Sequence, residues 1–133
     1  MTTTPPGRRW LWITWLTLAA ILVGGCGGGG GDGQANAVRY TVRGVIEKLP
    51  AVDGPDHAIY IHHAAIPDYR NEAGEVVGMM SMVMPFPVAD GVSLDGLAVG
   101  DPVEFTFTMQ WQPHGHYEIV AIAELPTGTV IAF

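Results

Sequence analysis

The sequence predicts a small all-β domain, a five-stranded barrel of the OB type, over residues 38–133. Five short runs of β-branched, aromatic and other apolar residues alternate with polar residues, which is the period of a half-buried strand. Gly, Pro and Asp separate these runs, and no stretch among them shows a convincing helical pattern. Short strands with frequent turns fit a small closed barrel better than an open sandwich.

Residues 1–25 are predicted to be a secretory signal peptide. Arg8 and Arg9 form its positive start, and the apolar residues 10–23 have the length of a signal-peptide core. This stretch is shorter than the ~20 residues of a membrane-spanning helix, so a membrane anchor is the weaker alternative. Val23-Gly24-Gly25-Cys26 resembles the lipobox of bacterial lipoproteins, in which small residues precede a cysteine that is cleaved and acylated.

Cys26 is the only cysteine of the chain, so no disulfide can form within it. A run of glycines follows directly and offers no core in which a structural thiol could be buried. Lipidation of Cys26 is therefore the better explanation, and residues 26–37 form a flexible Gly-rich tether. The sequence thus predicts a lipoprotein of the bacterial cell envelope, anchored to the membrane and facing the periplasm.

The five strands are predicted at residues 40–46, 58–63, 82–88, 103–109 and 117–124. The first is β-branched and alternating, and it ends before Pro50. The second places Ile59, Ile61 and His63 on one face. The third contains two prolines and is therefore confined to an edge or a bulge of the sheet. The fourth and fifth are joined by a hairpin tip at residues 112–115.

The candidate ligands are four methionines within residues 79–84, preceded by the pair His62-His63. Thioethers and imidazoles without a thiolate favour monovalent copper over zinc or magnesium. Met82 and Met84 alternate onto one face of the third strand, and His63 continues the apolar face of the second. If these faces line the barrel, the three side chains point inward near the same end.

Met79 precedes the third strand and can reach over that end of the barrel. Three thioethers and one imidazole then form a site for Cu(I), with Ag(I) as its surrogate. The alternative is that the methionines are flexible core filler.

At these residues the chain resembles the CusF-like periplasmic copper-binding domains, including the version found beside Sco-type proteins. The family has a His closing the second strand, an Ile-Pro loop and a Met-x-x-Met-x-Met-x-Phe segment. These features are matched by His63, Ile66-Pro67, Met79, Met82, Met84 and Phe86. Residues 97–105 also resemble the Leu-x-x-Gly-Asp-x-Val-x-Phe start of the family's fourth strand. The resemblance implies an OB barrel that binds Cu(I) through His63, Met82 and Met84.

The chain departs from the family pattern in two ways. In the best-known branch a Trp occupies the position of Met79 and caps the copper by a cation–π contact; here Met79 would be a fourth ligand instead. Additional residues around 70–77 also leave both Met79 and Met80 as candidates for the third thioether.

Weaker metal candidates lie elsewhere. His114 and His116 at the predicted hairpin tip could bind Cu(II) or Zn(II), although exposed turn histidines without a role are the simpler interpretation. Met80 belongs to the same weaker group. His62 faces away from His63 and is expected to be solvated.

Charge and composition exclude some functions. The formal net charge is −7, and loss of residues 1–25 with Arg8 and Arg9 leaves four basic and thirteen acidic residues, or −9. A nucleic-acid partner is therefore not expected. No convincing Ser-His-Asp or Cys-His arrangement is present, so the chain is not interpreted as an enzyme.

These patterns predict an extracytoplasmic Cu(I) chaperone or buffer. It would pass copper to an efflux pump or to a Sco-type assembly factor, because neutral thioethers release the metal to a thiolate by ligand exchange. The alternative is a binding module without metal, for a peptide, an oligosaccharide or an envelope partner.

Overall fold

The computed structural model describes residues 37–51 and 56–133. Five strands run through this part of the chain: β1 Val38–Lys48, β2 Ala58–His63, β3 Met82–Pro87, β4 Pro102–Gln110 and β5 His116–Glu124. In these residues no helix is long and apolar enough to cross a membrane. The predicted all-β class and the five strands are confirmed, and their ends differ from the predicted ones by at most two residues.

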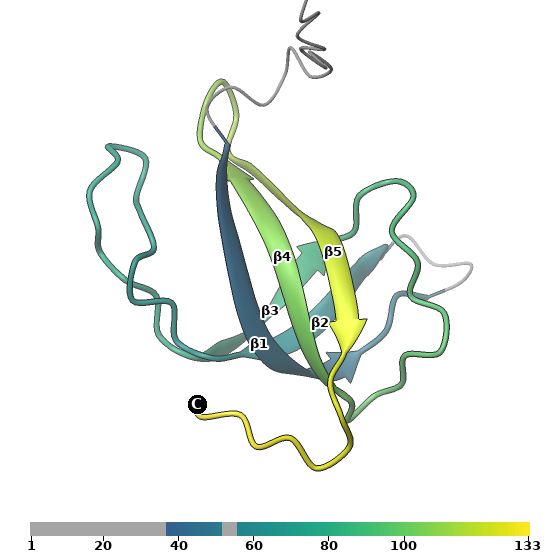
Figure 1. Cartoon of the computed structure of the whole chain (residues 1–133). Coiled ribbons are helices and arrows are strands. Elements are labelled where there is room, and N and C mark those ends of the chain that lie inside the picture. The colour runs from purple at the N-terminus through teal and green to yellow at the C-terminus, as the bar shows by residue number, and fades with distance from the viewer. Residues whose placement is uncertain (1–36, 52–55) are drawn as a thin grey trace, which may run out of the picture. The chain divides into compact units, whose positions relative to one another are not determined.

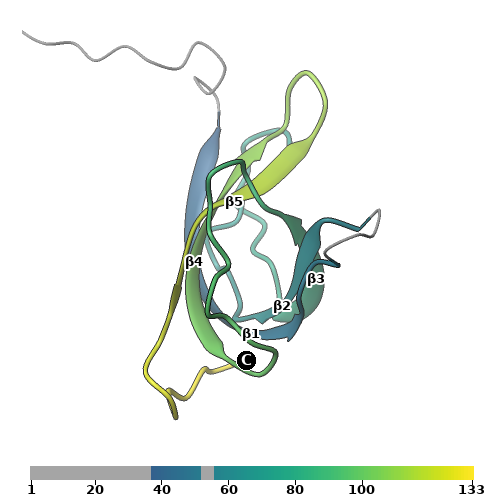
Figure 2. The same cartoon turned by 90° about the vertical axis from the view of Figure 1, so that its right-hand side faces the viewer.

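The strands form one antiparallel sheet in the order β3-β2-β1-β4-β5. The sheet curls until its two outer strands meet, with Val88 and Ile119 forming a parallel bridge between them (Figures 1 and 2). The backbone N–H of Ala89 donates to the carbonyl oxygen of Ile119 at 2.9 Å. The result is a small barrel, as the strand pattern predicts.

The third strand lies at the sheet edge, as its two prolines predict. Tyr117 of β5 fastens this edge, since its hydroxyl donates to the carbonyl oxygen of Pro85 at 3.0 Å. Its ring meets that of Phe86 edge-on, with centroids 5.9 Å apart. Burial raises the pKa of Tyr117 above its ordinary value of 10.0, so the phenol stays neutral and remains a donor.

The core lies inside the barrel and follows from the period-two alternation of every strand. Three phenylalanines form its centre: Phe86 lies 5.0 Å from Phe105 and 5.3 Å from Phe107, measured between ring centroids. Phe86 is fully buried even though it belongs to the edge strand. The aromatic cluster therefore holds β3 against β4 and keeps the barrel closed.

Residues 64–81 connect β2 to β3 as a long arm, which projects from the strands in teal in Figure 1. The arm is paired with itself, because Ile66 bridges Met79 and Arg70 bridges Val76 in antiparallel fashion. Tyr40 on β1 holds its middle, since the tyrosine hydroxyl accepts a hydrogen bond of 3.0 Å from the Arg70 N–H. The additional residues around 70–77 thus belong to an ordered, hydrogen-bonded arm.

Gly44 on β1 allows β2 to approach closely where the strand ends. It pairs with His63 on β2 and with Val103 on β4. A Cβ atom at this position would lie 2.5 Å from Cγ2 of Ile61 and 2.6 Å from the carbonyl oxygen of His62. Neither atom can move freely, because one belongs to a branched core side chain and the other to the backbone. Glycine is required here for space.

We therefore expect Gly44→Ala to lower the free energy of unfolding by ~1–3 kcal/mol, as overpacking does. Urea denaturation measures this change. Gly115→Ala is the matched control, since its Cβ would meet only the Trp111 ring, at 3.8 Å, and should cost less than ~0.5 kcal/mol. Equal stability of Gly44→Ala and the parent would contradict the close approach of the two strands.

Candidate metal centre

His63 is the last residue of β2 and is fully buried. Its Nδ1 lies 2.8 Å from the carbonyl oxygen of Ala64. Because a carbonyl oxygen only accepts, Nδ1 carries the proton, and in the neutral ring Nε2 presents a lone pair. In the part of the chain that the structure describes, this Nε2 is the one buried side-chain nitrogen or oxygen without a hydrogen-bond partner. Buried polar atoms are normally paired, and an unpaired one is often a site at which an ion or another ligand binds.

Thioethers lie across the β2–β3 ladder from this histidine. His63 is directly opposite Met82, and the next inward-facing pair joins Ile61 to Met84. Opposite residues of an antiparallel pair share one face, so both sulfur side chains lie on the face of His63. Met84 is half-buried against the core, as expected. Met82 lies on the expected face but is 45% exposed, so it lies at the rim of the barrel and not inside it.

The two candidates for the third thioether differ in their environment. Met79 exchanges two backbone hydrogen bonds with Ile66, of 2.8 and 2.9 Å, and its side chain packs against the core. Met80 is 80% exposed. Successive side chains of an extended segment point to opposite sides, so only one of the two can face His63. The structure favours Met79, and the role of all four side chains as ligands stays a prediction.

His62 lies on the outer face, as the alternation predicts. It is not simply solvated, however. Its Nε2 shares a hydrogen bond of 3.1 Å with Oγ of Ser81, and its ring stacks on Phe133 with centroids 3.9 Å apart. Sequence reasoning missed both contacts, because no local pattern links Phe133 to β2.

Of the hairpin histidines, His114 lies on the β4–β5 connection and His116 is the first residue of β5. His114 is exposed, and Nε2 of His116 lies 3.5 Å from a carboxylate oxygen of Glu118. Across residues 37–51 and 56–133, no three His, Cys, Asp or Glu side chains form a metal-binding group.

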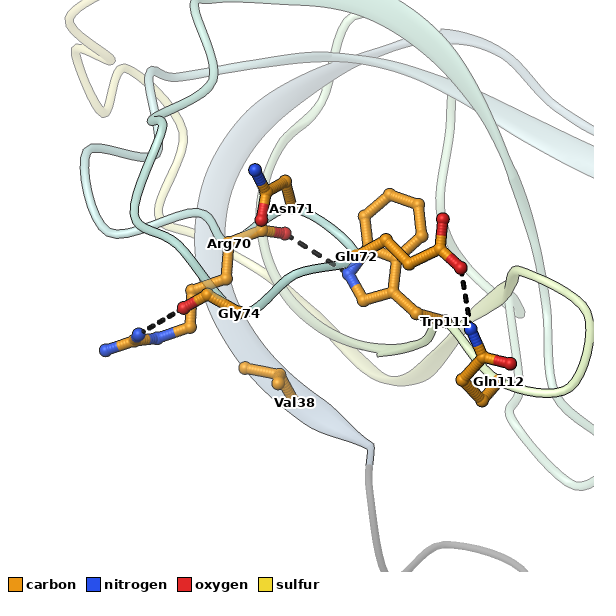
Figure 3. Close-up of a pocket in the computed structure, with 7 residues that line it drawn as sticks. All are labelled: Val38, Arg70, Asn71, Glu72, Gly74, Trp111 and Gln112. Atoms are coloured by element: carbon orange, nitrogen blue, oxygen red, sulfur yellow. Dashed lines mark hydrogen bonds between the residues drawn. The ribbon is translucent and has the colours of Figure 1, made fainter.

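A pocket of about 210 Å³ lies between the arm and the β4–β5 hairpin (Figure 3). It is lined by Val38, Arg70, Asn71, Glu72, Gly74, Trp111 and Gln112. The polar groups that line it are largely paired with one another: the Trp111 indole N–H donates to the Arg70 carbonyl oxygen at 3.2 Å, and the Gln112 amide donates to Glu72 at 2.6 Å. This lining includes none of the predicted ligands, and it contains no buried side-chain nitrogen or oxygen that lacks a partner, as Nε2 of His63 does.

The predicted signal peptide of residues 1–25, Cys26 and all of the tether except Ala37 lie outside the described residues. The predicted lipid anchor is therefore carried by the sequence alone.

Comparison with known proteins identifies a family for the chain. The family model of the copper binding periplasmic protein CusF matches residues 39–124, a range that contains all the predicted ligands of the barrel. A crystal structure of Ag(I)CusF is 22% identical, with a TM-score of 0.43, over 66% of this chain and 99% of that chain. A structure of apo-CusF from Escherichia coli is also 22% identical, with a TM-score of 0.46, over 69% and 93%. No curated protein matches the chain.

The unpaired Nε2 predicts that His63 contributes little to stability without metal. Replacement by Leu removes a buried acceptor that has no partner, and this gain offsets the lost bond to Ala64. We expect His63→Leu to change the free energy of unfolding of the metal-free protein by less than ~1.5 kcal/mol in urea denaturation.

Ile61→Ala is the control on the same buried face and should cost ~2–5 kcal/mol. A comparable loss in His63→Leu would mean that the histidine is a structural core residue.

Proposed function

The chain belongs to the family of the copper-binding periplasmic protein CusF, and on this premise we propose that its barrel binds one Cu(I) ion through His63, Met79, Met82 and Met84. The observation that carries the proposal is the unpaired Nε2 of His63, a residue that shares its face of the β2–β3 ladder with Met82 and Met84. An imidazole nitrogen with thioether sulfurs is a soft, neutral donor set, and such a set suits Cu(I) and its chemical surrogate Ag(I).

The hydrogen bond to Ala64 supports this assignment. Metal-binding histidines commonly donate their second ring nitrogen to a carbonyl or carboxylate oxygen, which sets the tautomer and aims the lone pair. Here Nδ1 of His63 has such a partner, and Nε2 faces the site already unprotonated when the ring is neutral. Apart from any movement of the methionines, the imidazole is ready to bind.

The exposure of the donors supports a role as a copper carrier. Met82 is 45% exposed at the rim, whereas His63 is fully buried. A stronger donor of another protein can therefore reach the ion from the Met82 side and replace the thioethers one at a time. We propose that the protein is a copper chaperone or buffer whose recipient is an efflux pump or a Sco-type assembly factor.

Anchoring through lipidated Cys26 would hold this carrier at the membrane on the periplasmic side. The support is in the sequence: a lipobox-like Val23-Gly24-Gly25-Cys26 follows an apolar segment of signal-peptide length, and a glycine run follows the cysteine. A flexible tether lets the barrel meet partners at various distances from the bilayer.

One soft site predicts one tight Cu(I) per chain. Anaerobic titration followed by native mass spectrometry should show a single Cu(I) or Ag(I) adduct that an equal concentration of Zn(II) does not displace, because zinc prefers thiolate, imidazole and carboxylate ligands. Two equally tight copper ions, or equal occupancy by zinc, would contradict a single thioether site.

Methionine replacements test the ligand set. Met82→Leu and Met84→Leu keep the apolar volume, so stability should change by less than ~1.5 kcal/mol. Cu(I) affinity should nevertheless fall at least ~tenfold. Loss of a residue that merely supports a metal ligand already lowers metal affinity by about this factor, and loss of a ligand should cost no less. Competition with a colorimetric Cu(I) chelator measures the affinity.

Met80→Leu is the matched control, since this side chain is 80% exposed. Its affinity should equal that of the parent. Parent-like binding by Met82→Leu and Met84→Leu would show that the methionines are core filler.

A further inference from the structure

The C-terminal residues 125–133 reach the outer face of β2, on the side of the strand opposite to the candidate metal centre. They contribute none of the proposed ligands. Residues 125–133 follow β5, and the N–H of Leu125 donates to the carbonyl oxygen of Pro102 at 2.8 Å. A turn follows, in which Thr129 donates from its N–H and its hydroxyl to the carbonyl oxygen of Pro126, at 3.0 and 2.6 Å. This segment lies beyond the residues of the family match.

The segment ends on His62 (Figure 1 marks the end of the chain). The rings of Phe133 and His62 are stacked, with an interplanar angle of 11° and centroids 3.9 Å apart. Phe133 remains 55% exposed and does not pack against the hydrophobic core. The Phe133 ring is therefore partly buried by contacts such as the stack on His62, and not by the hydrophobic core.

His62 in turn holds the start of β3. Its Nε2 shares a hydrogen bond of 3.1 Å with Oγ of Ser81. Ser81 directly precedes Met82 and follows Met79 by two residues, at the bend where the arm enters β3. A fixed Ser81 therefore limits how Met79 and Met82 can lie relative to His63.

We propose that Phe133, acting through His62 and Ser81, is a positioning residue that holds Met79 and Met82 in place before Cu(I) binds. The stack restrains the His62 ring, the ring restrains Ser81, and the bend at Ser81 sets the direction in which Met79 and Met82 lie. A metal site whose donors are already held in place loses less conformational entropy on binding than one whose donors are free. This inference rests on the proposed function.

Phe133→Leu removes the ring and keeps an apolar side chain. The full-length chain in detergent should bind Cu(I) about three- to tenfold more weakly, because loss of this contact weakens one hydrogen-bonded restraint. Phe133→Tyr keeps a stacking ring and should restore the parent affinity. Val130→Ala alters a side chain of the same segment that is 90% exposed, and it should have no effect.

A second measurement needs no copper. Isotope-labelled methionine methyl groups report by NMR how strongly each side chain is restrained in the metal-free protein. Phe133→Leu and Ser81→Ala should each shift and sharpen the Met79 and Met82 signals, and should leave the Met109 signal unchanged because that residue lies in the core of β4. The double variant should resemble either single variant, since both act along one chain of contacts.

The outcomes separate this inference from the proposed function. A parent that fails to bind Cu(I) overturns the proposed function, and the metal-free methyl signals still test the positioning role. A parent that binds Cu(I), combined with Phe133→Leu that keeps both the affinity and the methyl signals, overturns the positioning role alone. Reduced affinity that Phe133→Tyr fails to restore also overturns it.

Discussion

Nδ1 of His63 is bonded to the carbonyl oxygen of Ala64, while Nε2 of the same buried ring has no protein partner. Much of the surrounding structure serves to hold the ring in this state. Gly44 lets β1 pass close to the end of β2, and the β2–β3 register places Met82 opposite the imidazole. An unpaired buried polar atom costs free energy, so a fold that retains one gives up stability for an available lone pair.

Because β3 lies at the edge of the sheet, its inward-facing side chains become more exposed from one end of the strand to the other. Phe86 anchors the far end of the strand in the core, Met84 is half-buried, and Met82 reaches the rim. The prolines that confine β3 to the edge thus also keep one sulfur open to solvent. A site on a central strand would be covered by neighbours on both sides, and the metal would then exchange only after local unfolding.

Alternation in the sequence predicted the five strands and the shared faces of β2 and β3, and the two prolines predicted the edge position of β3, because each depends on neighbouring residues. Contacts between distant segments left no such signal. Gly44 could have been noticed as an isolated glycine within a strand, which indicates close approach. The unpaired nitrogen and the stack of Phe133 on His62 depend on how the chain folds back, and no local pattern encodes them.

Charge gives a further reason why this donor set would suit Cu(I). Thioethers and a neutral imidazole contribute no charge, so a bound monovalent ion leaves a net charge of +1 in a partly buried site, whereas a divalent ion leaves +2. The solvation energy that an ion loses on burial grows steeply with its charge, and neutral donors compensate only part of it. Zinc would also lose its preferred thiolate and carboxylate ligands. The site would therefore select against zinc by burial as well as by softness, even though the chain as a whole carries a net charge of −7.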